Sequence, residues 1–169
     1  MRSIFAIVSM VGLVLGMSVI LAQEKKEQNA SEQNVSNQTL SALIKLNKKI
    51  ENITFVGVTG EKKTLEELKG AKATIVVFFN FQCPISNGQT PELIELAEKY
   101  KEKKVNIIGV CCDVESPKEL ENHIQEFKIN FPVFYDPEHF VSTAFLADIT
   151  PQVYLIDSAM TLRYFGRIN

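Results

Sequence analysis

Three cysteines, Cys83, Cys111 and Cys112, are the residues with the clearest capacity for chemistry. Cys83 follows an apolar run and stands directly before Pro84, a residue favoured in the first turn of a helix. A thiol at a helix start is surrounded by unpaired backbone N–H groups and by the positive end of the helix dipole, and both favour the thiolate. Because the thiolate is the nucleophilic form of cysteine, the sequence predicts that Cys83 is the working residue.

The residues next to Cys83 help to decide whether it is a reactive or a structural cysteine. A buried structural cysteine acts as a small hydrophobic residue, whereas Cys83 is flanked by the polar residues Gln82 and Ser86. A hydrogen bond from the Ser86 hydroxyl to a Cys83 thiolate also favours ionisation. These neighbours favour the reactive interpretation.

Cys111 and Cys112 stand at the end of a second apolar run. Successive strand residues face opposite sides of a sheet, so only one of the two can point towards Cys83. That one is a candidate resolving thiol if its Cα atom comes within about 7 Å of the Cα atom of Cys83. The alternative is a pair of inert strand-end cysteines. An odd number of cysteines leaves at least one thiol free, reactive or paired with another molecule.

Strands and helices must position these residues, and the apolar pattern predicts both. Residues 73–79 and 105–111 are apolar runs typical of strands buried on both faces, and residues 84–104 between them have helical spacing. Strand, helix and strand in this order predict a right-handed parallel unit. The other predicted elements are strands over 53–58, 131–135, 152–157 and 161–168, a helical turn over 64–70, a helix with a capping box from Ser116, and a helix over 137–147. Together they predict an α/β sandwich around one sheet.

Residues 78–86, with the motif Cys-Pro-Ile-Ser, resemble the active-site segment of the thioredoxin-like superfamily. Cys83 falls where the attacking cysteine of that superfamily stands, and Pro91 falls where a proline kinks the helix. Thr150-Pro151 resembles the cis-proline loop. Similarity to the redoxins, the alkyl hydroperoxide reductase and thiol-specific antioxidant type, extends through residues 60–68, 154–157 and 162–167. The resemblance covers about residues 47–169 and implies a thioredoxin-like α/β/α sandwich.

The resemblance also implies roles for site residues. Thr150 and Pro151 are expected to contact an extended substrate chain, because the cis-proline peptide faces the attacking cysteine in that family. X-Pro is the one peptide link that is readily cis, and an ordinary loop proline is the alternative. Ser86 replaces the second cysteine of the family, and Val77 replaces its buried acid. A disulfide attacked by Cys83 must therefore be resolved by another thiol, with protein disulfides and an external thiol reductant as the expected partners.

Two other activities remain open. Peroxidatic relatives carry Pro-x-x-x-Thr-x-x-Cys and an arginine leading a later strand, where this chain has Val76, Asn80 and Pro151. A thiol peroxidase acting on hydroperoxides is therefore an alternative that lacks most of its peroxide-holding donors. A catalytically weak client-binding module is the second alternative. Arg163 and Arg167 can reach the site from the last strand, but solvated or structural roles are expected for both.

The net charge, the cysteine spacing and the positions of the histidines argue against nucleic-acid binding and copper delivery. A net charge of -2 with no basic stripe argues against nucleic acid as a partner. Copper-delivery relatives space two cysteines as Cys-x-x-x-Cys, whereas position 87 is Asn here, and His123 and His139 are expected to be exposed helix residues. No metal and no cofactor is expected.

The N-terminal residues differ in composition from the rest. Residues 3–22 are apolar without charge, which predicts a cleaved signal peptide or an uncleaved membrane anchor over residues 1–22. Residues 23–39 are polar and predict a disordered linker before a domain over residues 40–169. The protein is thus expected to be exported: periplasmic, secreted or membrane-anchored, with membrane contact only through this segment.

The family resemblance implies a helix after the last strand, where this sequence stops at Asn169. The predicted fold therefore lacks its C-terminal helix. Either the sequence is a fragment, or residues 40–50 or another chain cover the exposed face of the sheet.

Overall fold

The computed structural model describes residues 45–168. The predicted export segment, the predicted linker and residues 40–44 lie outside the described residues. Within 45–168, no helix combines the length and the apolar character that crossing a membrane requires.

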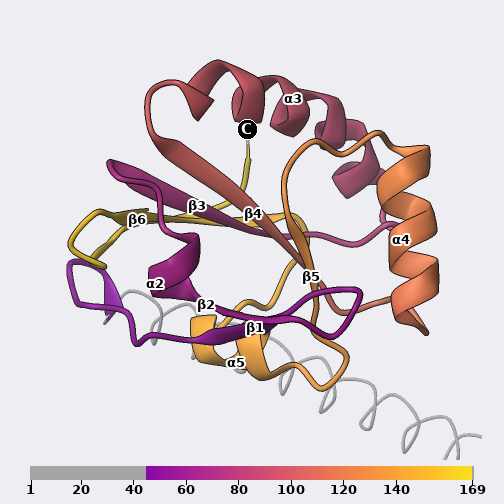
Figure 1. Ribbon diagram of the computed structural model, residues 1–169, viewed down its shortest axis with the longest axis horizontal. Helices are drawn as coiled ribbons and strands as arrows, with labels where there is room; N and C mark the ends of the chain where they lie inside the picture. Colours follow the sequence, from indigo (N-terminus) through magenta and orange to yellow (C-terminus); the bar gives the residue numbers. More distant parts are fainter. Residues whose placement is uncertain (1–44, 169) are drawn as a thin grey trace, which may run out of the picture. The chain divides into compact units, whose positions relative to one another are not determined.

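The described residues fold around one seven-stranded sheet with the order β2-β1-β5-β4-β3-β6-β7 (Figure 1). Its strands are β1 (Thr54–Val56), β2 (Lys62–Thr64), β3 (Ala73–Phe78), β4 (Val105–Cys111), β5 (Val133–Tyr135), β6 (Gln152–Asp157) and β7 (Leu162–Gly166). β3, β4 and β5 run parallel, and β6 pairs antiparallel with both β3 and β7. The predicted parallel unit and the closing antiparallel hairpin are confirmed.

Helices cover both faces of this sheet. They are α2 (Leu65–Leu68), α3 (Pro84–Lys101), α4 (Pro117–Glu126) and α5 (Phe140–Phe145). Buried residues of α3 and α4 pack in one hydrophobic cluster, and those of α2 and α5 pack in a second cluster. Figure 1 shows α3 above the sheet, with α2 and α5 on the other side of it. The predicted α/β/α sandwich is confirmed.

Alternation along the strands distributes side chains between the two layers. On β3, Phe78 packs in the cluster that contains α5, whereas Val77 packs in the cluster that contains α3. On β4, Val110 packs in the cluster that contains α5, and Cys111 packs in the cluster that contains α3. The same alternation therefore decides which layer each residue at the end of a strand faces.

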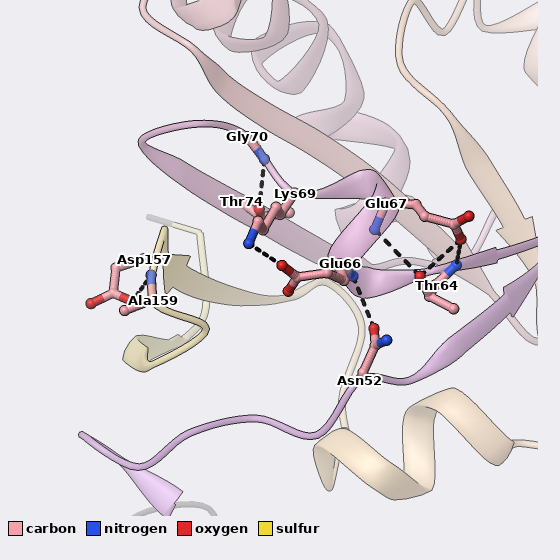
Figure 2. Close-up of polar contacts among 9 residues, drawn as sticks. All are labelled: Asn52, Thr64, Glu66, Glu67, Lys69, Gly70, Thr74, Asp157 and Ala159. Carbon is pink, nitrogen blue, oxygen red and sulfur yellow. Dashed lines mark hydrogen bonds and ion pairs between the residues drawn. The ribbon is translucent and has the colours of Figure 1, made fainter.

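The helix α2, predicted as a helical turn over 64–70, begins with a capping box at Thr64 (Figure 2). The backbone N–H of Glu67 donates to Thr64 Oγ1 at 3.3 Å, and the N–H of Thr64 donates to Glu67 Oε2 at 2.7 Å. This second bond is the main reason that the pKa of Glu67 lies below its ordinary value. Asn52 Oδ1 accepts from the N–H of Glu66 at 2.9 Å and joins the chain before β1 to this helix.

The capping box predicted at Ser116 forms only in part. Ser116 Oγ accepts from the N–H of Glu119 at 3.2 Å, as predicted. The Glu119 carboxylate accepts from the N–H of Glu115 at 2.7 Å, one residue earlier than a capping box requires. The helix begins where the sequence predicts, but the predicted bond from the N–H of Ser116 to the Glu119 carboxylate is wrong.

One further expectation needs correction. The helix predicted over 137–147 is shorter, because the Asp136 carboxylate accepts from the N–H groups of Val141 at 3.1 Å and Ser142 at 2.9 Å and so fixes its start.

Residues 45–50, the described part of the segment before β1, run along β7. The N–H of Asn47 donates to the carbonyl of Leu162 at 2.8 Å. Leu46 and Ile50 pack in the cluster that contains α2 and α5.

Tyr154 carries a buried hydroxyl that has no hydrogen-bond partner among the described residues. Its side chain is 0% exposed and packs against the rings of Phe78 and Phe145, and burial raises the pKa of its hydroxyl. An unpaired buried polar group destabilises the folded state. We expect Tyr154→Phe to raise the free energy of unfolding by about 1 kcal/mol in denaturant titration. A loss of stability would show that the hydroxyl has a partner.

Candidate functional site

Cys83 lies at the junction between β3 and α3, where its backbone is extended (φ -89°, ψ 115°). The loop before it is held by Asn80, whose Oδ1 accepts from the N–H of Gln82 at 2.6 Å and whose carbonyl accepts from the N–H of Cys83 at 3.2 Å. The carbonyl of Cys83 accepts the first helical bond from Asn87 at 3.0 Å. Cys83 is thus the residue immediately before the helix, and its side chain is partly exposed.

The start of α3 lowers the pKa of the Cys83 thiol below its ordinary value. The largest cause is the backbone N–H of Ser86, with further contributions from the N–H of Ile85 and from the side chains of Ser86 and Thr150. Partial burial opposes the shift. Hydrogen bonds to the charged form therefore favour a thiolate, which is the physical condition for a nucleophile.

Ser86 is buried beneath this thiol, with 1% of its surface exposed. Its Oγ accepts from the N–H of Asn80 at 3.4 Å, which leaves its own hydrogen free to donate to Cys83. The backbone of Ser86 is held as well, because Thr90 Oγ1 donates to the carbonyl of Ser86 at 3.0 Å. Thr90 directly precedes Pro91, the proline inside α3. The hydroxyl thus occupies a fixed position beside the sulfur atom.

The Thr150–Pro151 peptide is cis, as the sequence predicts. It precedes β6, the neighbour of β3, and so meets Cys83 at the same end of the sheet. The carbonyl oxygen of Thr150 lies 3.8 Å from Cys83 Sγ and accepts its hydrogen. The structure therefore brings together the four residues that the sequence assigns to the site: Cys83, Ser86, Thr150 and Pro151.

Two cavities flank Thr150. One, which we call the cis-proline cavity, has a volume of about 230 Å³ and is lined by residues that include Ile85, Pro151 and Arg167. The other, which we call the Cys112 cavity, has a volume of about 240 Å³ and is lined by residues that include Asn80 and Cys112. Thr150 lines both cavities, so both adjoin the peptide that contacts Cys83.

The two neighbouring cysteines have different surroundings, and all three cysteines are free thiols. Cys111 is buried in the cluster with α3 and α4, and burial raises the pKa of its thiol to about 11. Cys112 is half-buried on the opposite side, with Sγ 3.6 Å from Asp136 Oδ2. Burial, reinforced by the Asp136 charge, raises the pKa of Cys112 to about 12. Of the two, Cys112 is the one that lines a cavity beside Thr150.

The two arginines take different positions. Arg163 donates to Asp157 at 2.7 Å and to Asn47 at 3.1 Å, the structural role expected for it. Arg167 lines the cis-proline cavity instead, a position that the sequence does not predict. The register of β6 and β7 brings it there: Gly166, the last residue of β7, pairs with Val153, so the chain that follows β7 runs towards the start of β6 and Pro151.

The two histidines have different surroundings, and His139 lines the Cys112 cavity. His123 stacks on the Phe81 ring with 4.7 Å between centroids, so the expectation that it is an exposed helix residue is wrong. His139 is exposed and immediately precedes α5, as expected from its helix-start context. Within residues 45–168, no group of three or more His, Cys, Asp or Glu side chains is placed to hold a metal ion.

Known proteins resemble this chain over the same residues. The model of the AhpC/TSA family matches residues 46–165. Thiol-disulfide oxidoreductase YkuV of Bacillus subtilis is 29% identical over an alignment of 118 residues, and the match covers 64% of this chain and 79% of that protein. Thiol-disulfide oxidoreductase ResA of Bacillus cereus is 29% identical over 114 residues, which are 68% of this chain and 65% of ResA, just under two thirds of that protein.

A solved structure confirms the fold. The crystal structure of an uncharacterized conserved protein from Geobacillus kaustophilus superimposes with a TM-score of 0.69 at 27% identity and covers 73% of this chain and 69% of that one. The family match and the named relatives confirm the prediction of a thioredoxin-type oxidoreductase. Since the family model spans the sheet, Cys83 and the cis-proline loop together, this chain belongs to the AhpC/TSA family.

Proposed function

We propose that this protein is an exported thiol-disulfide oxidoreductase that uses Cys83 as its single attacking thiol. The observation that carries the proposal is the position of Cys83 at the start of α3, where the N–H groups of Ser86 and Ile85 lower its pKa. The relatives YkuV and ResA, both named thiol-disulfide oxidoreductases, support the reaction class.

The reaction proceeds by thiol-disulfide exchange. The Cys83 thiolate attacks one sulfur atom of a disulfide, forms a mixed disulfide and releases the other half as a thiolate. The backbone of Thr150 and Pro151, which borders Cys83, holds the extended substrate chain beside the sulfur. An external thiolate then attacks the substrate sulfur of the mixed disulfide and releases Cys83 as a thiolate. Electrons and protons balance without a cofactor.

An external thiol is needed because the motif contains no second cysteine. Ser86 occupies that position, and its hydroxyl cannot attack a disulfide under ordinary conditions. Val77 stands where the family has a buried acid that assists a second thiol. Its side chain is buried among apolar neighbours and has no ionisable group, so this assistance is missing. Cys112 is a second candidate for resolution because it lines a cavity beside Thr150, but its raised pKa disfavours the attacking thiolate.

Export is part of the proposal and rests on residues 1–22, whose apolar character predicts a signal peptide or a membrane anchor. A free, reactive thiol in an oxidising compartment needs a dedicated reductant, since the surroundings favour disulfides. The requirement for an external thiol and the predicted location are therefore consistent with each other.

The proposal is tested by mixing the reduced full chain with a disulfide and, in a separate sample, with hydrogen peroxide. We expect a mixed disulfide at Cys83, detected by peptide mass spectrometry and released by added thiol, and slow reaction with peroxide. The Cys83→Ser variant is the control and is expected to form no mixed disulfide at this position. Faster sulfenic acid formation than disulfide exchange would identify a peroxidase. Inertness towards both reagents would leave a client-binding module.

A further inference from the structure

We propose that the cis-proline cavity is a subsite for a carboxylate carried by the disulfide that Cys83 attacks, with the Arg167 guanidinium as its partner. The inference rests on the proposed function and adds the substrate class: disulfides with an acidic group near the reacting sulfur atoms. Nothing in the reaction itself requires this preference, so it is open to a separate test.

The lining of the cavity fits such a group. Arg167 is the one charged residue among the described residues that line it. Most of the rest is apolar, and Ile85, Ile149 and Pro151 contribute aliphatic surface. An aliphatic chain that ends in a carboxylate matches this combination, because its stem contacts apolar surface while its charge meets the guanidinium.

Two hydrogen bonds hold the backbone on which Arg167 is placed. The Tyr164 hydroxyl donates to the carbonyl of Arg167 at 3.0 Å. The Gln89 side chain donates from Nε2 to the carbonyl of Ile168 at 3.0 Å and ties the residue after Arg167 to α3. These bonds hold two successive carbonyls, those of Arg167 and Ile168, at the edge of the cavity. The position of Arg167 is therefore fixed from both β7 and α3.

The guanidinium is available to a ligand. In residues 45–168, Arg167 takes part in no ion pair, whereas Arg163 on β7 pairs with Asp157. Its side chain is exposed. Arginine presents a planar set of donors that matches a carboxylate in a bidentate arrangement. A ligand carboxylate would thus meet an arginine that is not already neutralised.

The cavity adjoins the reacting sulfur atom. Thr150 lines the cavity, and its carbonyl accepts from Cys83 Sγ at 3.8 Å. Ile85, two residues after Cys83, forms another part of the wall and is 65% exposed. On the other side of Thr150, the Cys112 cavity is lined by Asp113 and Asp148, which repel an anion. The charges therefore direct an acidic group towards Arg167.

The test compares two disulfide probes on the full chain. The first is the dianionic 5,5′-dithiobis(2-nitrobenzoate), and the second is the uncharged 4,4′-dithiodipyridine. The ratio of their rate constants for reaction at Cys83, with the Cys83→Ser rate subtracted, reports charge recognition and cancels differences in thiol reactivity. We expect Arg167→Gln to lower this ratio about threefold and Arg167→Glu about tenfold, and added salt to reduce the effect.

Matched variants separate a local subsite from overall charge. Arg163→Gln removes the same charge from β7, four residues earlier in the chain, and is expected to leave the ratio unchanged, whereas Arg167→Lys keeps the charge and is expected to retain most of the ratio. An equal fall in Arg163→Gln and Arg167→Gln, or no fall in either, would overturn the subsite. A wild-type Cys83 that reacts with neither probe would instead overturn the proposed function.

The acidic group has two possible sources, a small peptide thiol or an acidic segment of a client protein. Glutathione disulfide and its methyl ester represent the first source, and a disulfide-linked peptide with Asp or Gln beside its cysteine represents the second. We expect the Arg167→Gln variant to lose the acid preference within at least one pair. Retention of the preference in both pairs would contradict the proposal.

Discussion

Iodoacetamide at pH 7 is expected to modify Cys83 about a hundredfold or more faster than Cys111 or Cys112 in the folded full chain. The difference follows from the protonation of the three thiols, because only the thiolate reacts with the reagent. The pKa of Cys83 lies below its ordinary value, whereas those of Cys111 and Cys112 lie near 11 and 12. Each unit of pKa above the working pH lowers the thiolate fraction about tenfold.

The pH dependence has a definite sign. As pH rises, the rate at Cys83 is expected to increase and then level off with a midpoint below the value of about 8.5 for a free cysteine. The rates at Cys111 and Cys112 are expected to keep rising far above that pH, as long as the fold survives. Peptide mass spectrometry after timed quenching resolves the three cysteines in one sample.

A matched variant tests the cause of the shift. Ser86→Ala removes the hydroxyl but keeps the backbone N–H of Ser86, which is the largest contribution to the lowered pKa. The midpoint at Cys83 is therefore expected to rise only in part towards that of a free cysteine. Equal alkylation rates at all three cysteines, or an ordinary midpoint at Cys83, would show that the start of α3 does not stabilise a thiolate.

Ser86→Cys is expected to convert the single-thiol site into one that resolves its own mixed disulfide. The side chain lies one helical turn after Cys83, beneath its sulfur, and sulfur replaces oxygen with little change of shape. Attack within the molecule has an effective concentration far above that of a dissolved thiol. We expect the lifetime of the mixed disulfide at Cys83 to fall about a hundredfold or more at fixed external thiol.

The measurement follows the trapped mixed disulfide by mass spectrometry across a range of external thiol concentrations. In the natural sequence, its decay is expected to be proportional to that concentration. In Ser86→Cys, the decay is expected to be independent of it, and a disulfide within the motif should accumulate. Because Val77 offers no acid to the new thiol, the rate is expected to rise with pH.

Ser86→Ala is again the control, since it removes the hydroxyl without adding a thiol. Its mixed disulfide is expected to decay in proportion to the external thiol. If the natural sequence already resolves its mixed disulfide without an external thiol, Cys112 becomes the resolving residue. The Cys112→Ser variant would then restore the dependence, and the single-thiol mechanism would be contradicted.

Local features of the site could be predicted from the sequence because neighbours along the chain create them. Pro84 after Cys83 favours a helix start through its own backbone geometry, and the structure places Cys83 directly before α3. The Thr64 cap and the Ser116 helix start follow from contacts within four residues. The start of α5 was misplaced because the Asp136 side chain, which lies outside the helix, decides it.

The sequence alone determined which cysteine we propose as the attacking residue and the absence of a second thiol in its motif, because both depend on residue types at fixed spacing. The cis peptide before Pro151 was implied by the family resemblance and is present in the structure. Only the tertiary structure decided that Cys112 rather than Cys111 lines a cavity beside Thr150, and that Arg167 lines the cis-proline cavity. The position of Cys112 depends on which side of the sheet each residue at the end of β4 faces. The position of Arg167 depends on the register of β6 and β7, which shifts between Leu155 and Ile156. Register is set by packing between distant segments, so no short pattern in the chain specifies it.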